Sequence, residues 1–236
     1  MADTFTIPKR VRVRWVRQHR IIATRYPPID LFERLDLPEA QKRALWALQA
    51  RTNPRLLQET GDVRLVRPGD MVSGPHASVV MAAFTHIGFP SRFSDGRVGV
   101  YYAGRALETA IRETVFHRER DARASELAPD EWHMRAWIGQ VRRPLYDVRG
   151  AGFESLRHPD PAHYAAPQAF ARRLRKADPD AWGLVYRSVR HEGGDCIAAF
   201  RPPAVSLPVQ GPLLVYVWNG ERVTTVYEKS EPLLTF

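Results

Sequence analysis

The sequence predicts an α+β fold whose strands pair mostly in antiparallel fashion, at least towards the C-terminal end. Short β-type runs separated by turns dominate the chain after Gly61. Asn219-Gly220 lies between two such runs, residues 213–218 and 222–227. An Asn-Gly pair in that setting is a strong hairpin signal. Helical patterns flank the strands, so we expect a mixed, largely antiparallel β core covered by helices.

Length and composition suggest an intracellular globular protein. The 236 residues suit one large domain or one domain with an extension, and they can bury a core without disulfide or metal staples. Cys196 is the single cysteine, which fits a reducing cytosol. The N-terminus lacks a signal-peptide pattern, and no apolar stretch approaches the roughly 18 residues needed to span a bilayer. We therefore expect a cytoplasmic protein without a membrane partner.

The charge balance is basic and rests mainly on arginine. There are 35 Lys and Arg residues against 26 Asp and Glu residues, a formal net charge of +9. Such a balance favours an anionic partner, whether nucleic acid, a phosphorylated metabolite or an acidic protein. Arginine suits planar, bidentate recognition of phosphate or carboxylate. The alternative is that arginine simply replaces lysine on an ordinary surface.

Residues 1–60 are predicted to form a basic, helical N-terminal extension, and residues 61–236 the main domain. Residues 1–25 interleave Lys and Arg with apolar side chains. This pattern fits either a segment that tracks a phosphate backbone or an amphipathic arm that packs on the main domain or on a partner. We favour the arm because its apolar spacing is regular. Residues 29–51 show helical patterns on both sides of Pro38.

Beyond residue 61 the elements follow from periodicity and turn signals. Residues 118–123 are expected to be a solvated charged run after a helix that opens at about Ala106. Pro167 falls in the first turn of a helix that Asp178-Pro179 terminates. Strands are expected at residues 63–67, 98–102, 132–141, 145–148, 183–190, 196–200, 213–218 and 222–227, and further helices at residues 77–85 and 164–177.

Several standard motifs are missing from the sequence. It has no GxxxxGK[ST] phosphate loop, no GxGxxG, no CxxC, no HExxH and no GxSxG. His158 and His163 are five residues apart without a supporting cysteine, so we expect no zinc site and no other metal.

The strongest candidate site is the stretch 91–117, which combines a cation, an aromatic ring and a carboxylate. Arg92 precedes Phe93 and a turn, a short β-type run follows, and Glu113 lies in the helix after it. Glu113 shares a helix face with three small residues, Ala106, Thr109 and Ala110, which leave room for a ligand. The alternative is that Glu113 pairs with Arg112, Arg105 or His117 on the surface.

Further elements accompany this stretch in a definite order along the chain. They are Arg67 at a strand end, Arg92-Phe93 before a turn, Tyr102-Ala103, Thr109-Ala110 with Glu113, Ser188 before Gly193-Gly194, and a closing Val217-Trp218-Asn219-Gly220. Taken in order, these elements resemble the RES-domain family, the toxin half of RES–Xre bacterial toxin–antitoxin pairs. The resemblance covers roughly residues 61–227 and leaves residues 1–60 outside. The usual Arg-Trp of the family is Arg-Phe here.

The resemblance implies a fold like that of the ADP-ribosyltransferases and NAD as the substrate. Family members degrade NAD by hydrolysis or phosphorolysis, and some transfer ADP-ribose to a protein. By this resemblance Glu113 stabilises the charge that develops on the ribose when the nicotinamide bond breaks. Arg67 and Arg92 clamp the pyrophosphate or a phosphate nucleophile. Tyr102 stacks on nicotinamide, or Tyr101 does if the strand register slips by one, and Ser188 hydrogen-bonds the ribose or the amide.

The same resemblance implies an Xre-like antitoxin as the protein partner, with nucleic acid reached only through that antitoxin. A protein ADP-ribosyltransferase on the same scaffold is the alternative, with residues 1–60 available to dock a protein target. A further alternative is a nucleic-acid-binding module based on the arginine-rich residues 1–25.

Overall fold

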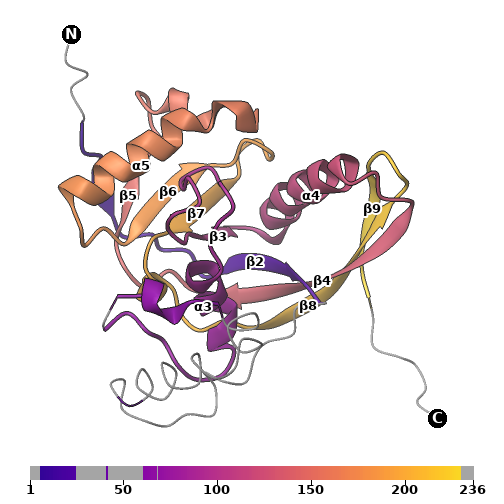
Figure 1. Cartoon of the computed structure of the whole chain (residues 1–236), viewed down its shortest axis with the longest axis horizontal. Helices are drawn as coiled ribbons and strands as arrows, with labels where there is room; N and C mark the ends of the chain where they lie inside the picture. The colour runs from indigo at the N-terminus through magenta and orange to yellow at the C-terminus, as the bar shows by residue number, and fades with distance from the viewer. Residues whose placement is uncertain (1–5, 25–40, 42–60, 68, 230–236) are drawn as a thin grey trace.

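A computed structural model describes residues 6–24, 41, 61–67 and 69–229. In this part of the chain nine strands form one sheet in the order β1-β5-β6-β7-β3-β2-β4-β8-β9 (Figure 1). β5 and β6 are parallel, and the other neighbouring strands are antiparallel. The predicted α+β class with a largely antiparallel sheet is therefore confirmed.

The elements have the following bounds. The strands are β1 (Arg10–Val11), β2 (Gln18–Ala23), β3 (Tyr101–Gly104), β4 (Asp130–Gly139), β5 (Leu145–Asp147), β6 (Gly183–Arg187), β7 (Asp195–Ala199), β8 (Val209–Trp218) and β9 (Val223–Glu228). The α-helices are α3 (Ala77–Thr85), α4 (Leu107–Ala124) and α5 (Ala165–Ala177), and the short 3-10 helices are η2 (Val63–Leu65), η3 (Glu154–Arg157), η4 (Pro161–His163) and η5 (Pro202–Ala204).

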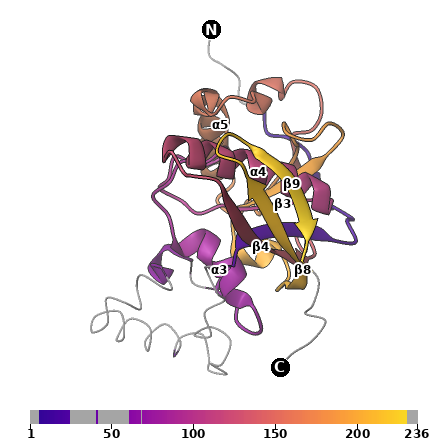
Figure 2. The same cartoon turned by 90° about the vertical axis from the view of Figure 1, so that its right-hand side faces the viewer.

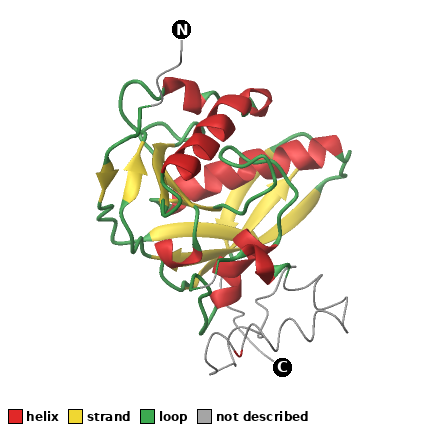
Figure 3. Ribbon diagram, turned by 60° about the vertical axis from the view of Figure 1, so that its left-hand side comes forward, coloured by secondary structure: helices red, strands yellow, loops and turns green. Residues whose placement is uncertain are grey.

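The helices cover both faces of the sheet (Figures 1 and 3). Successive side chains of a strand point to opposite faces of the sheet. The clusters that alternate residues of β6 and β7 join therefore show which helix lies on which face. Val185 and Ile197 share a core cluster with α3, whereas Leu184 and Ala198 share one with α5. α4 packs its apolar stripe on β2, β4 and β8, through residues such as Ile111. The α3 and α5 layers therefore sandwich the sheet.

β2 lies in the middle of the sheet, between β3 and β4. Ile21 and Ala23 are buried there beside Met134 and Leu214. Residues 10–11 and 18–23 are thus strands of the main sheet, which corrects the prediction that residues 1–60 form a helical extension. The buried Ile21 and Ala23 lie at alternate positions, as expected in a strand, but the partner strand β4 lies more than 100 residues away in the chain. The helices expected within residues 29–51 fall outside the described residues, apart from Gln41.

Residues 63–65 form the 3-10 helix η2, not the predicted strand. Asp62 caps it, because its carboxylate accepts a hydrogen bond from the Arg64 backbone N–H at 3.0 Å and binds the Arg64 guanidinium as well. Val63 and Val66 are buried while Leu65 is exposed. The two buried valines are three residues apart, which is a helical spacing. The alternation of polar and apolar residues in this segment had instead predicted a strand.

α4 extends to Ala124, so the charged run expected after His117 is its final part. Ala122 is buried at 1% exposure, and Arg123 pairs with Glu119 one turn earlier at 2.7 Å. The helix that carries Glu113 is therefore longer and better anchored than the sequence pattern indicated.

The predicted hairpin at Asn219-Gly220 is confirmed, and its strands β8 and β9 form one edge of the sheet (Figure 2). The Asn219 side-chain oxygen accepts hydrogen bonds from the backbone N–H groups of Glu221 and Arg222, both at 2.9 Å. Gly220 has φ = +97°, a conformation that glycine adopts without steric cost. In the described part of the chain, no helix is both long enough and apolar enough to cross a bilayer.

Candidate active site

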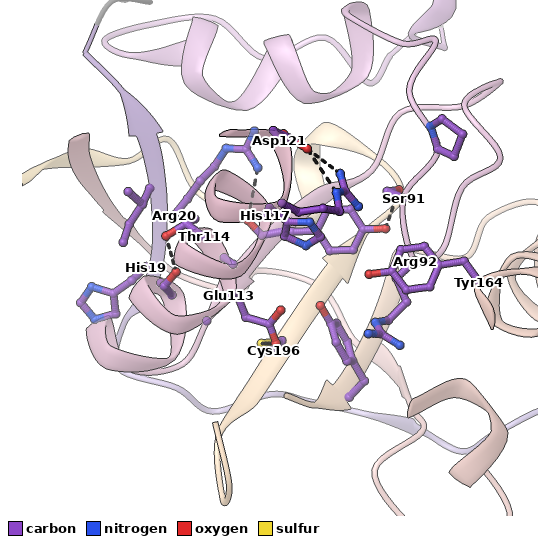
Figure 4. Close-up of a pocket in the computed structure, with 18 residues that line it drawn as sticks. His19, Arg20, Ser91, Arg92, Glu113, Thr114, His117, Asp121, Tyr164 and Cys196 are labelled. Atoms are coloured by element: carbon purple, nitrogen blue, oxygen red, sulfur yellow. Dashed lines mark hydrogen bonds and ion pairs between the residues drawn. The ribbon is translucent and has the colours of Figure 1, made fainter. Parts of the chain in front are cut away.

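A cavity of about 350 Å³ opens on the face of the sheet that α4 and α5 cover. Figure 4 shows Glu113 beside Cys196, with Arg92 and Tyr164 lying together. β2, β3, β6, β7, α4 and the loop before β3 all contribute walls. Its lining includes Arg20, Arg92, Tyr102, Glu113, His117 and Cys196.

Glu113 is held in this cavity by Ser188, which follows β6 directly. The Ser188 hydroxyl donates to Glu113 Oε1 at 2.6 Å and accepts from the backbone N–H groups of Arg190 (3.1 Å) and His191 (3.0 Å). Ser188 itself is not among the residues that line the cavity. In this structure the Ser188 hydroxyl hydrogen positions the Glu113 carboxylate. The hydrogen bond from Ser188 to a ligand stays a prediction.

The thiol of Cys196 is the second group beside this carboxylate, with Sγ 4.0 Å from Glu113 Oε1. Burial, followed by the nearby Glu113 charge, raises the pKa of Cys196 well above its ordinary value. The thiol therefore stays protonated and is a neutral neighbour of the carboxylate, not a nucleophile.

Two features keep α4 close to the sheet, so that Glu113 can reach Ser188 and Cys196. A Cβ on Gly104, the last residue of β3, would lie 2.8 Å from the backbone nitrogen of Ala110. Thr109 Oγ1 lies 2.9 Å from His191 Nδ1, so the helix is tied to the turn that follows Ser188. The glycine allows the close approach, and the Thr109–His191 contact holds the helix at that position.

Arg92 lies in the cavity wall as predicted, and it is 6% exposed. Its Nη1 donates to the carbonyl oxygens of Leu156 and His158, both at 3.0 Å, and its guanidinium lies 4.8 Å from the centre of the Tyr164 ring. The two carbonyl contacts fix the Nη1 end of the planar Arg92 guanidinium. Because Arg92 lines the cavity, the remaining N–H groups of the guanidinium suit an anionic ligand.

Tyr102, not Tyr101, lines the cavity. The Tyr102 hydroxyl accepts from the Phe93 backbone N–H at 2.9 Å and lies 2.9 Å from Ser91 Oγ. Burial raises the pKa of Tyr102 to about 12, so the hydroxyl stays protonated at neutral pH. Tyr101 points to the opposite face, where Gln18 Nε2 donates to its hydroxyl at 2.9 Å. The structure thus contradicts the slipped register that would have placed Tyr101 in the site.

Arg67 is not in this cavity. It lines a separate hollow, and its Nη1 lies 3.5 Å from Asp180 Oδ1. The expectation that Arg67 and Arg92 clamp one phosphate together is wrong, because η2 packs beside α3 on the opposite face of the sheet.

Arg20, on β2, is a cavity residue that sequence reasoning missed. Its Nη1 donates to the carbonyl oxygen of Tyr102 at 3.2 Å, and its guanidinium lies 4.7 Å from the centre of the Tyr101 ring. Its Nε is buried and has no hydrogen-bond partner in the described part of the chain. Burial lowers the pKa of Arg20. A cation among the β-type residues of β2 was the available signal, since a buried guanidinium needs polar or aromatic neighbours.

His117 lies one turn after Glu113 on α4 and lines the same cavity. Burial, followed by the charges of Arg120 and Arg190, lowers the pKa of His117 to about 4. At neutral pH the imidazole is therefore uncharged. The cavity lining then includes three arginines (Arg20, Arg92 and Arg120), two carboxylates (Glu113 and Asp121) and two histidines (His19 and His117).

Comparison with known proteins shows the family to which the chain belongs. The model of the RES domain matches residues 64–219, which is more than half of the chain. The chain belongs to the RES-domain family. RES domains are found in the toxins of toxin–antitoxin pairs. The uncharacterized protein y4oC of Sinorhizobium fredii is 26% identical over 212 residues, which cover 89% of this chain and 86% of that protein.

The RES-domain match includes Arg92, Tyr102, Glu113 and Ser188, the predicted residues that the fold brings together. Arg20 lies before the matched region, yet its strand completes both the sheet and the cavity. In this RES-domain protein the site is therefore larger than the matched segment.

The arrangement in this RES domain suits one kind of chemistry. A carboxylate fixed by a hydrogen bond can stabilise positive charge that develops on a substrate. Guanidinium groups can bind phosphate oxygens in planar, bidentate fashion. An aromatic wall can pack against a flat ring. A substrate that joins a phosphate to a sugar and a cationic ring would use all three.

Proposed function

We propose that this RES-domain protein consumes NAD by cleaving the bond between nicotinamide and ribose. The supporting observation is the Glu113 carboxylate, held at 2.6 Å by Ser188 inside a cavity whose wall also carries Arg20, Arg92 and Tyr102. The family membership supports the same proposal.

The proposed reaction needs no general acid. The nicotinamide ring of NAD is cationic, so it leaves as a neutral molecule when the C–N bond breaks and the electron pair stays on nitrogen. The ribose carbon then gains oxocarbenium character, as in glycoside hydrolysis. In the proposal, the negative charge of Glu113 stabilises that carbon and orients the oxygen nucleophile that bonds to it. The nucleophile is water, which loses a proton to the medium, or inorganic phosphate.

The remaining residues are assigned to binding. Arg20 and Arg92 pair with the pyrophosphate, because two cations from different elements reach one cavity. Tyr102 packs against the nicotinamide ring. His117 stays neutral, so it adds a hydrogen-bonding group without repelling the developing positive charge.

Glu113→Gln tests this proposal, because it removes the charge and preserves the shape of the side chain. We expect nicotinamide release from NAD, followed by chromatography, to fall by about 10³-fold or more in the variant. Glu108→Gln is the matched control on the same helix, since Glu108 is exposed and pairs with Arg112. Its activity should match that of the unaltered protein. Unimpaired nicotinamide release by Glu113→Gln, or none by the unaltered protein, would refute the proposal.

The product of NAD cleavage identifies the molecule that accepts the ADP-ribosyl group. Without phosphate, hydrolysis yields free ADP-ribose, and with phosphate, phosphorolysis yields its phosphorylated form. Label from NAD that remains on a macromolecule would instead indicate transfer of ADP-ribose to a protein. The reaction is therefore run with labelled NAD, with and without orthophosphate.

The proposal also includes a partner, an Xre-like antitoxin that covers the cavity. The support is the occurrence of RES domains in toxins, together with the need to silence an enzyme that drains NAD. We expect expression of the chain alone to arrest growth, and co-expression with a small Xre-like protein encoded beside it to restore growth. The Glu113→Gln chain should not arrest growth. Growth arrest by that variant would separate toxicity from NAD cleavage.

A further inference from the structure

A second hollow, of about 140 Å³, lies apart from the proposed NAD site, and four arginines line it. None of its lining residues is shared with the first cavity. It is built from η2 and the loop after it, the loop before β3, the end of α5 and the end of β7. Its charged lining residues are Arg67, Arg97, Arg175, Arg201 and Asp70.

The positive charge of Arg201 is already paired with acidic side chains. Arg201 binds Asp70 through Nε and Nη2, both at 2.7 Å, and Nη1 lies 3.1 Å from Asp180 Oδ1. Arg67 has only the longer contact to Asp180, at 3.5 Å, and the Asp180 side chain is 81% exposed, so this pair is weak. Asp95 accepts from the Arg97 backbone and pairs with Arg172, which is outside the hollow. The acids nearby therefore leave an excess of positive charge.

Arg175 supplies the decisive feature, a donor without an acceptor. Its guanidinium lies 3.8 Å from the centre of the Phe200 ring, and its Nη1 donates to the Phe93 carbonyl oxygen at 3.4 Å. Its Nη2 is buried, and no described residue accepts a hydrogen bond from it. A buried charged donor without a partner is unfavourable, and Arg175 is one of the residues that line the hollow. Burial lowers the pKa of Arg175 to about 10, so the group still carries its charge at neutral pH.

We propose that this hollow binds a phosphate group, either orthophosphate or the terminal phosphate of a small monoester. Arg67, Arg97 and Arg175 come from three different elements, and donors from several directions suit a tetrahedral oxyanion better than a planar carboxylate. A volume of about 140 Å³ accommodates a phosphate group. Leu65 and Val98 line it too, with 45% and 43% exposure, and offer apolar surface to an ester group.

Arg67→Gln combined with Arg97→Gln tests the site without disturbing the buried core, since both side chains are exposed. Orthophosphate is titrated into each protein in a calorimeter. We expect the double variant to bind at least about tenfold more weakly than the unaltered protein. Arg64→Gln is the matched control, because Arg64 is a neighbouring exposed arginine that pairs with Asp62 outside the hollow. Its affinity should not change.

Two further measurements place and identify the ligand. Crystals soaked in selenate, a phosphate mimic with an anomalous signal, should show a peak beside Arg175 that disappears in the double variant. Tighter binding of phenyl phosphate than of orthophosphate would identify a monoester, and the reverse order would identify the inorganic ion. Binding that is equal in the double variant and the unaltered protein, or the absence of a selenate peak beside Arg175, would overturn the proposal. Neither result bears on NAD cleavage by Glu113.

Discussion

At the scale of single residues, the Ser188 hydroxyl determines how Glu113 is presented. It accepts two backbone hydrogen bonds from the turn after β6 and donates its only hydrogen to the carboxylate. A hydroxyl used in this way fixes both the rotamer of Glu113 and the shape of the turn. Ser188 is thus a positioning residue, and its effect on a reaction passes through Glu113.

Ser188→Ala should lower kcat for NAD cleavage by about 10- to 100-fold with little change in KM, because the carboxylate loses its orientation but the binding residues remain. The free energy of unfolding should fall by about 1 kcal/mol as the turn loses its acceptor. Steady-state kinetics and urea unfolding measure the two effects. Ser188→Thr keeps the hydroxyl and should restore most of kcat. A rise in KM as large as the loss in kcat/KM would instead mean that Ser188 touches the substrate.

His117→Gln should flatten the acid dependence of stability. The pKa of His117 is about 4 in the folded protein and 6.5 ordinarily. Between these values the unfolded chain binds a proton that the folded chain does not, so stability is present above pH 6.5 and is lost as the pH falls towards 4. The loss amounts to at most about 3 kcal/mol.

Urea unfolding between pH 4.5 and 7.5 measures this effect. The stability of the unaltered protein should fall more steeply with falling pH than that of the variant. His163→Gln, which alters an exposed histidine, should leave the dependence as it is. Parallel curves for His117→Gln and the unaltered protein would show that His117 does not titrate in this way.

At the scale of elements, the β3–α4 unit carries the site. The sequence pattern predicted its order of strand, glycine break and helix, and the order is correct, although β3 begins at Tyr101 and not at Val98. The helix begins after Ala106, whose backbone is still extended. Gly104 lets the first turns of α4 approach the sheet, so the position of Glu113 depends on a residue nine positions away.

Gly104→Ala should destabilise the protein by about 1–3 kcal/mol, because its Cβ would meet the Ala110 nitrogen at 2.8 Å and the Thr109 side chain at 3.1 Å. NAD cleavage should fall as well, since α4 must shift. Urea unfolding and kinetics on the same variant measure both. Gly150→Ala is the control, because a Cβ there meets nothing within 4 Å. Equal stability of the two variants would show that α4 has room to move.

At the scale of the whole molecule, the chain does not divide at residue 60. β2 lies between β3 and β4, and its Gln18 and Ile21 side chains are buried on opposite sides of the sheet. Arg20 on the same strand reaches the cavity. The N-terminal segment is therefore part of both the core and the candidate site.

Ile21→Asp should cost about 3–5 kcal/mol or prevent folding, because it buries a charge without a partner in the centre of the sheet. Val16→Asp provides the control on the same segment, since Val16 is 80% exposed, and it should change stability little. Thermal and urea unfolding compare the two. A separate, dispensable extension would instead tolerate both changes equally.

The sequence by itself determined the local elements and the order of the family motif. α3 lies where its apolar pattern predicted, the Asn219-Gly220 hairpin forms, and Arg92, Tyr102 and Glu113 share one cavity. These features depend on helical periodicity, turn chemistry and residues near one another in the chain, which act over short distances.

Only the tertiary structure decided which distant residues join them. It placed Arg20 in the cavity, moved Arg67 to the second hollow, chose Tyr102 over Tyr101 and turned Ser188 towards Glu113. Each of these outcomes depends on the packing of segments that lie far apart in the chain. That packing is selected by burial of the complete sheet, because no short stretch of sequence can bury its own apolar face.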